Sequence, residues 1–112
     1  MVLSGDRDGL VNRLDTLGID TIVKEAAVAL DDTYDQIGEL GIVTGHVDEA
    51  AEVVAGMRSE IEALVAEVPE RPEPLTYYHE LDDTLYSVTS QTFIGEIYSL
   101  AGLKSVADAA DP

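Results

Sequence analysis

The residues of this sequence that could do chemistry are concentrated in residues 77–97, YYHELDDTLYSVTSQTFIGEI. The first part of this stretch places Glu80, Asp82 and Asp83 directly after His79. Neighbouring carboxylates can act as a general acid and base, or they can supply the oxygen ligands that hard cations prefer. One hypothesis is therefore a carboxylate-based metalloenzyme in which these four side chains converge.

The second part of the stretch offers hydroxyl and amide groups, at Tyr86, Ser87, Thr89, Ser90 and Gln91. These side chains can both donate and accept hydrogen bonds, which suits a polar ligand that carries oxygen acceptors. The connection over residues 80–91 has about twelve residues, more than the two to six that are usual between a strand and a helix, so it is either functional or disordered. A second hypothesis is therefore a ligand-binding wall.

Motifs that would favour catalysis are absent from the sequence. It contains no HExxH, Gly-rich phosphate loop or Gly-x-Ser-x-Gly elbow, and its carboxylates lack the Asp-x-Asp-x-Asp-Gly run of a calcium loop. The sequence contains two histidines, His46 and His79. A histidine in such a position is more often a surface or strand residue than a metal ligand. We expect a binding protein without a metal site of its own.

The elements that must position this stretch alternate between strands and helices. The apolar spacing and the turn residues predict a strand at 1–4, a helix from Leu10 to Gly18, a strand at 19–23 and a helix that begins near Asp31 or Asp32 and ends at Gly41. This order predicts an α/β fold. In open α/β sheets, ligands bind beyond the carboxyl ends of the strands, which is where residues 80–91 would lie.

A long amphipathic helix is the clearest prediction. Its apolar side chains follow steps of three and four over residues 47–68, and at ~1.5 Å per residue it would be about 30 Å long. Pro69, Pro72 and Pro74 then prevent the helix from continuing. Beyond them we expect a strand at residues 75–81 and a helix at residues 92–101.

Composition excludes several classes of protein. The 112 residues include 23 acidic and 6 basic ones, and this net charge of −17 would repel nucleic acids and anionic membrane surfaces. The acidic surface is typical of a protein adapted to salt, or of a face that recognises a basic partner. The absence of cysteine excludes disulfides, and neither a signal sequence nor an apolar run long enough to cross a membrane is present.

Two longer segments resemble a known family. The segments ALDDTYDQIGELGIVTGHVDEAAEVVAGMRSEIEAL and TFIGEIYSLAGLKSVAD are similar to parts of the binding proteins that serve ABC importers of the vitamin B12 and ferric-siderophore type. That family has two α/β lobes joined by a rigid helix, and it binds a ligand between the lobes without catalysis. The resemblance implies a partial two-lobe fold from the middle of a longer protein, with the first lobe ending at residues 1–46, the connecting helix at 47–68 and the second lobe beginning at 69–112.

The resemblance also implies a ligand, a location and partners. The ligand would be a metal chelate such as an iron-siderophore, cobalamin or haem, and the parent protein would be periplasmic or a lipoprotein outside the cytoplasm that delivers this ligand to a membrane permease. No cofactor is implied. The residues expected to contact the ligand are Tyr78, Glu80, Asp83, Tyr86, Ser87, Thr89 and Gln91, together with Asp6 and Arg7 from the first lobe.

Two further expectations concern assembly and the tyrosines. A partial fold exposes strand edges that invite pairing between copies, so we expect a homo-oligomer that completes the fold. An acidic interaction or oligomerisation domain that binds no small ligand is the alternative. Because side chains alternate along a strand, only one of Tyr77 and Tyr78 can face the ligand, and the sequence leaves open which one.

Overall fold

A computed structural model describes residues 1–110, and the last two residues of the predicted 69–112 segment lie outside the described part. The elements follow one another as β1 (Val2–Ser4), α1 (Leu10–Thr16), β2 (Ile22–Lys24), α2 (Leu30–Thr44), α3 (Val47–Ala66), β3 (Leu75–Tyr77), α4 (Phe93–Leu100), β4 (Leu103–Ser105) and the 3-10 helix η1 (Val106–Ala109). The α/β prediction is confirmed.

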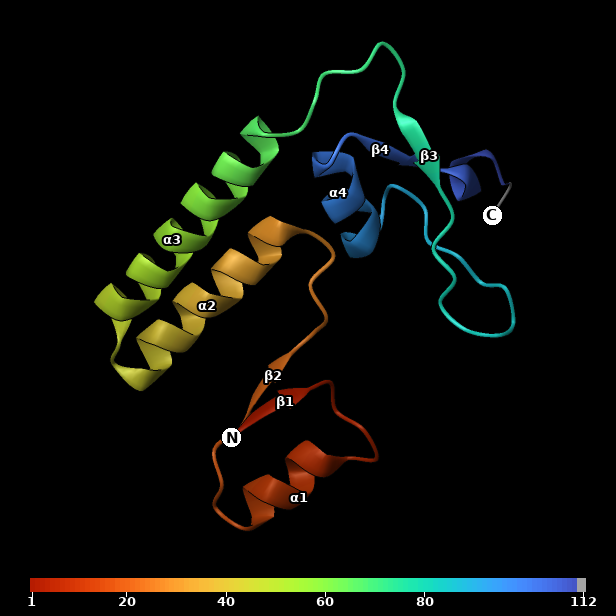
Figure 1. Ribbon diagram of the computed structural model, residues 1–112. Coiled ribbons are helices and arrows are strands. Elements are labelled where there is room, and N and C mark those ends of the chain that lie inside the picture. The colour runs from red at the N-terminus through yellow and green to blue at the C-terminus, as the bar shows by residue number, and fades with distance from the viewer. Residues whose placement is uncertain (111–112) are drawn as a thin grey trace.

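Two small parallel sheets lie apart from one another, and each is connected to the end of a pair of long helices that is opposite the turn between these helices (Figure 1). In the N-terminal unit, defined as β1, α1 and β2, Leu3 pairs with Val23. In the C-terminal unit, defined as β3, α4, β4 and η1, Thr76 pairs with Lys104. Each unit is a strand, a helix and a parallel strand, and α2 and α3 connect the two units.

Helices α2 and α3 pack closely side by side because Gly41 has no side chain. A Cβ placed on Gly41 would lie 2.5 Å from the Ala50 Cβ and 3.0 Å from the His46 carbonyl oxygen. The expected end of a helix at Gly41 is therefore wrong. The helix continues to Thr44 and ends at Gly45, whose φ of 75° is the left-handed conformation that glycine adopts readily.

Other boundaries shift by a few residues. Helix α3 ends at Ala66 rather than at residue 68, and α4 begins after Thr92, whose hydroxyl accepts a hydrogen bond from the Gly95 backbone N–H at 3.0 Å. The start of α2 is capped from inside the helix, since the Asp32 carboxylate accepts a hydrogen bond from the Ala29 N–H at 3.0 Å. Strand β4 and η1 were not anticipated, although they complete the C-terminal unit.

The molecule is open rather than compact. Its radius of gyration is 18.3 Å, against about 13 Å for a compact domain of this length. The chain exposes 8392 Å², whereas a compact monomer of the same mass exposes about 6000 Å². The buried side chains of the described residues are few, and they are Leu14, Tyr34, Ala50, Val88 and Ser105.

One hydrogen bond joins the C-terminal unit to α2. The Glu96 carboxylate on α4 accepts from the Leu30 backbone N–H, at the first turn of α2, at 2.8 Å. A negative charge at this position also interacts favourably with the helix dipole. Within residues 1–110, no helix combines the length and the apolar character needed to cross a membrane.

We predict that Gly41→Ala destabilises the protein by about 1–3 kcal/mol, because the added methyl group forces α2 and α3 apart. Gly38→Ala, on the same helix, is the matched control. A Cβ at position 38 meets nothing within 4 Å, so this variant should gain about 0.5–1 kcal/mol from its higher helix propensity. Urea unfolding followed by circular dichroism measures both changes, and equal midpoints for the two variants would contradict the role of Gly41.

Candidate functional site

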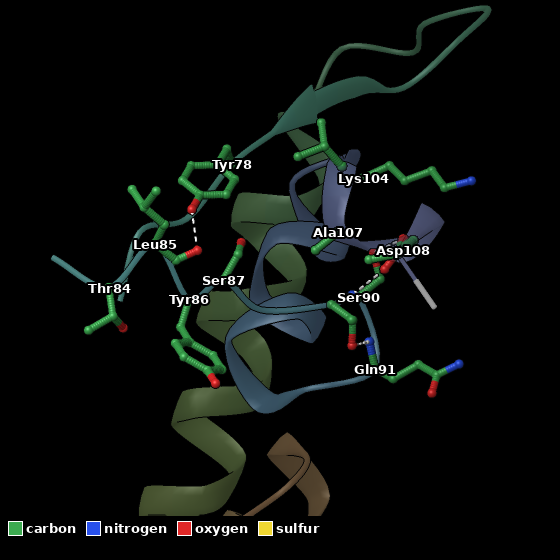
Figure 2. A pocket seen from close by; sticks show the side chains of 13 residues that line it. Tyr78, Thr84, Leu85, Tyr86, Ser87, Ser90, Gln91, Lys104, Ala107 and Asp108 are labelled. Atoms are coloured by element: carbon green, nitrogen blue, oxygen red, sulfur yellow. Dashed lines mark hydrogen bonds between the residues drawn. The ribbon is translucent and has the colours of Figure 1, made fainter. Parts of the chain in front are cut away.

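A hollow of about 1150 Å³ lies between the polar loop that follows β3 and the segment formed by β4 and η1. We call it the loop hollow. Figure 2 shows that side chains from both segments surround it. The residues that line it are Tyr78, Thr84, Leu85, Tyr86, Ser87, Thr89, Ser90, Gln91, Lys104, Val106, Ala107, Asp108 and Ala110.

A tight turn shapes the tip of the loop. The Asp82 carboxylate accepts a hydrogen bond from the Thr84 backbone N–H at 2.9 Å and another from the Thr84 hydroxyl. The bond from the Thr84 hydroxyl, and to a smaller extent the bond from the Thr84 backbone N–H, hold the pKa of Asp82 below its usual value. The Leu81 N–H donates to the Tyr86 carbonyl at 2.9 Å, which closes the turn. The Asp82 carboxylate therefore stabilises the turn of the loop through hydrogen bonds to Thr84.

Leu85 has a backbone conformation that is rare for its residue type. Its φ is 66°, in the left-handed region, and its side chain is 69% exposed. Such a conformation costs about 1–3 kcal/mol and persists only where the surroundings impose it. Here the Tyr78 hydroxyl donates a hydrogen bond to the Leu85 carbonyl at 2.5 Å, as Figure 2 shows. The strained turn thus places a large apolar side chain beside the loop hollow.

The opposite wall is held to the loop by hydroxyl groups. Ser90 donates from its backbone N–H and from its hydroxyl to the two oxygens of Asp108, each at 2.7 Å (Figure 2). The buried Ser105 hydroxyl donates to the Val88 carbonyl at 2.6 Å and accepts from the Ala107 N–H at 3.1 Å. The bonds from Ser90 to Asp108 and from Ser105 to Val88 connect residues that lie far apart in the sequence, so they fix the loop against β4 and η1.

The charge of Asp108 follows from these contacts. The Ser90 hydroxyl, and then the Ser90 backbone N–H, hold the pKa of Asp108 below its usual value of 3.8, and the positive charge of Lys104 acts in the same direction. Lys104 and Asp108 are the charged residues among the thirteen that line the hollow. Although the chain carries a net charge of −17, the lining itself contains one positive and one negative group.

Two buried hydroxyl oxygens have no hydrogen-bond partner within the described residues, those of Ser87 and Tyr77. Ser87 lines the hollow, whereas Tyr77 stacks on Tyr98 at 4.0 Å between ring centroids. A buried hydroxyl without a partner costs about 1–3 kcal/mol. A ligand with an acceptor oxygen would supply the partner that Ser87 lacks.

The structure brings together five of the nine predicted ligand residues. Those that line the loop hollow are Tyr78, Tyr86, Ser87, Thr89 and Gln91. Glu80 and Asp83 belong to the same loop but are not part of the lining, and Asp6 and Arg7 lie between β1 and α1. Of the two tyrosines between which the sequence does not decide, Tyr78 lines the loop hollow and Tyr77 stacks on Tyr98 of α4.

Asp6 and His79 are engaged in contacts within the fold. The Asp6 carboxylate accepts a hydrogen bond from the Val11 backbone N–H at 3.0 Å, near the start of α1. His79 Nδ1 lies 3.0 Å from the Tyr98 hydroxyl. Across residues 1–110, no group of three or more acidic, histidine or cysteine side chains could hold a metal ion. The convergence of Glu80, Asp82 and Asp83 with His79 that the metalloenzyme hypothesis needs is therefore not formed.

Sequence reasoning missed the second wall of the hollow. Leu85, Lys104, Val106 and Asp108 line it, although none was among the predicted residues. A usable signal was present in the apolar residues that follow Gly102, because a strand there would run parallel to β3. The carboxyl ends of parallel strands meet at one edge of the sheet, so residues after β4 had to lie near residues after β3.

Comparison with known proteins identifies the family. Residues 3–111 match the sequence profile of the family described as periplasmic binding protein. The chain belongs to this family. The resemblance to binding proteins of ABC importers is thereby confirmed, and the family is one of proteins that bind substrates.

Named relatives agree with this assignment. Cobalamin-binding proteins from two strains of Halobacterium salinarum are 32% identical to this chain over 103 residues. The match covers 90% of this chain and 27% of each relative. The chain thus spans about a quarter of the length of these relatives.

Solved structures share the fold. A possible iron-binding (periplasmic solute-binding) protein from Staphylococcus epidermidis matches 93% of this chain with a TM-score of 0.76, and the match covers 43% of that protein. An ABC transporter substrate-binding protein from Listeria monocytogenes matches 92% of the chain with a TM-score of 0.63 and 39% of its own length. Both are 18% identical to this chain. The partial binding-protein fold is therefore confirmed.

We predict that Asp108→Asn lowers the melting temperature near neutral pH, because an amide cannot accept both bonds from Ser90. The folded-state pKa of Asp108 lies below the unfolded value, so the ionised carboxylate stabilises the fold above about pH 3.8 and loses this effect as the pH falls through the lower folded-state value. The difference between the wild type and the variant should therefore shrink below about pH 3.8. Thermal unfolding over a pH series measures it.

Asp83→Asn, in the same loop and with the same change of charge, is the control for this prediction. It should change the melting temperature less than Asp108→Asn does near neutral pH. A gap between Asp108→Asn and the wild type that stays constant at every pH would show that the Asp108 carboxylate does not stabilise the wall.

Proposed function

We propose that the loop hollow is one wall of a ligand-binding cleft, and that it takes a bulky, metal-containing small molecule of the corrinoid type. The observation that carries the proposal is the hollow itself. It has a volume of about 1150 Å³ and combines exposed aromatic and aliphatic side chains with hydroxyl and amide groups. Sites for small molecules usually have this mixture of an apolar surface and a few polar groups.

The apolar part of the lining suits the body of a macrocycle. Tyr86 is 71% exposed, and Tyr78 and Leu85 are exposed as well. Tyrosine rings gain by stacking on flat organic surfaces, and they keep a hydroxyl for polar contacts. An exposed cluster of this kind is unfavourable in water unless a ligand covers it.

The charge of the lining supports a ligand without a large negative charge. Lys104 is balanced by Asp108, and the rest of the described lining is uncharged. An anionic chelate such as a ferric catecholate would need several cationic groups to offset the loss of its hydration. The polar rim of a corrinoid, which consists of amides, would instead find hydrogen-bond partners in Ser87, Thr89 and Gln91. The name of the cobalamin-binding relatives agrees with this choice.

The proposed role is capture and delivery rather than catalysis. In this proposal residues 1–46 end a first lobe, residues 47–68 connect the lobes and residues 69–112 begin the second lobe. The parent protein would work outside the cytoplasm and hand its ligand to a membrane permease of the ABC type. Glu80, Asp83, Asp6 and Arg7 remain predicted ligand residues that would act from outside the loop hollow.

We predict that cobalamin raises the melting temperature of this chain by several degrees. A ligand at about 100 times its Kd stabilises the native state by about 2.7 kcal/mol. Tyr86→Ala should remove most of the shift, and Tyr86→Phe should retain it, because the ring rather than the hydroxyl makes the contact. A ferric catecholate at the same concentration is the matched probe and should produce no shift. A response to the catecholate alone, or to neither probe, would contradict the proposed ligand class.

We also predict that Ser87→Ala leaves the stability of the free protein unchanged or slightly higher, because it deletes a hydroxyl that lacks a partner. The same variant should weaken cobalamin binding, as measured by titration calorimetry. Ser105→Ala is the control. It breaks the bond to the Val88 carbonyl and should cost about 1–3 kcal/mol of stability. Unchanged affinity in Ser87→Ala would remove Ser87 from the proposed site.

A further inference from the structure

A second surface of the molecule is apolar and has no partner within the described residues. It is a groove of about 460 Å³ along the side of α2 and α3, which we call the hairpin groove. It lies away from the loop hollow and shares no lining residue with it. The residues that line it are Tyr34, Asp35, Gly38, Ile42, Val47, Ala50, Ala51, Val54, Ala55 and Arg58.

The groove carries little charge although the chain as a whole is strongly acidic. Its described lining contains one negative residue, Asp35, and one positive residue, Arg58. The Arg58 guanidinium lies 4.1 Å from the centre of the Tyr34 ring and donates a hydrogen bond to Asp31 at 2.8 Å. Arg58 is therefore held in place at one end of the groove, and the remaining lining is small or aliphatic.

Large apolar side chains are exposed at the other end of the groove. Ile42 is 68% exposed and Val47 is 54% exposed, close to the turn between α2 and α3. Along α3, the groove is bordered by Ala51 and Ala55, whose small side chains let another helix approach closely. Two antiparallel helices with an open apolar groove form half of a four-helix bundle.

The area of the molecule indicates how much surface is available for burial. The chain exposes 8392 Å², about 2400 Å² more than a compact monomer of its mass. A stable dimer buries about 800 Å² on each partner. One interface of ordinary size would therefore use about a third of this excess, and the hairpin groove offers a part of the exposed surface that carries no net charge.

We propose that the hairpin groove binds the hairpin groove of a second copy of this chain, so that α2 and α3 of both copies form a four-helix bundle about a two-fold axis. A two-fold interface uses the same patch on both partners, and it closes without leaving a free groove for a third copy. This proposal does not depend on the ligand of the loop hollow.

The dimer depends on salt because of the charge outside the groove. Two chains with a net charge of −17 each repel one another. The range of this repulsion falls from about 10 Å in 0.1 M salt to about 3 Å in 1 M salt. The groove contributes no net charge at the contact itself, so screening of the surrounding acidic residues is sufficient for association.

Sedimentation equilibrium of the 112-residue chain over a series of salt concentrations tests this proposal. We expect monomer in low salt and dimer in high salt. Ala55→Glu places a charge in the groove and should raise the dimer dissociation constant at least tenfold. Ala63→Glu is the matched control, because Ala63 is exposed on the same helix and is not part of the groove lining. This control should change the dimer dissociation constant by a factor of no more than about two, because salt screens the one added charge outside the groove.

A second pair of variants on α2 keeps the test decisive if Ala55→Glu fails to fold, which circular dichroism would reveal. Ile42→Gln removes an exposed side chain from the groove, and Val43→Gln changes its exposed neighbour, which does not line the groove. We expect only Ile42→Gln to weaken the dimer. A chain that stays monomeric in high salt would overturn the proposal. A dimer that tolerates both groove variants would overturn it as well, and would indicate pairing through the open strand edges.

Discussion

The close approach of α2 to α3 at Gly41 is the contact on which the rest of the arrangement depends. The N-terminal unit is attached to the start of α2, and the C-terminal unit follows the end of α3. Each unit contains a sheet of two strands, which is marginally stable by itself. The position of the two sheets is therefore set by how α2 and α3 pack, and that packing allows no Cβ between Gly41 and Ala50. The Glu96 carboxylate of the C-terminal unit adds a second constraint, because it accepts a hydrogen bond from the Leu30 N–H at the start of α2.

Hydrogen bonds rather than a large core give the loop hollow its shape. The buried residues near it are Val88 and Ser105, and the Ser105 hydroxyl joins them through the Val88 carbonyl. The carboxylate of Asp108 accepts two bonds from Ser90, and bonds to a charged acceptor are stronger than neutral ones. Such a network positions side chains without filling the space between them. It thereby leaves Tyr86 and Leu85 exposed at the surface that a ligand would cover.

Periodic patterns in the sequence predicted the elements well, and local exceptions explain the errors. The stripe of apolar residues on α3 and the prolines that follow it located that helix to within two residues of its end. The predicted end of the helix at Gly41 was wrong because a glycine can allow close packing as well as end a helix. Only the position of Ala50 in the structure distinguishes these two roles. Whether Tyr77 or Tyr78 lines the loop hollow depends on the packing of Tyr77 in β3 against Tyr98 in α4, and this contact joins residues from different elements. The wall formed by the loop could be predicted because its polar residues lie close together in the sequence. The wall formed by β4 and η1 could not, because it depends on the pairing of β3 with β4, which are far apart in the sequence.

The distribution of charge connects the two surfaces to which we assign partners. Twenty-three acidic residues oppose compaction of this chain, and the six basic ones are too few to balance them. Three of these basic residues have clear positions: Lys24 pairs with Glu39, Arg58 lies at the hairpin groove and Lys104 lies at the loop hollow. A surface that must lose its water against a partner cannot carry unpaired carboxylates, because burying an unpaired charge is costly. In a chain as acidic as this one, the places without excess negative charge are the places where contact with another molecule costs least. The hollow and the groove meet this condition in different ways, since the hollow offers hydroxyl and amide groups to a small ligand and the groove offers aliphatic side chains to another helix pair.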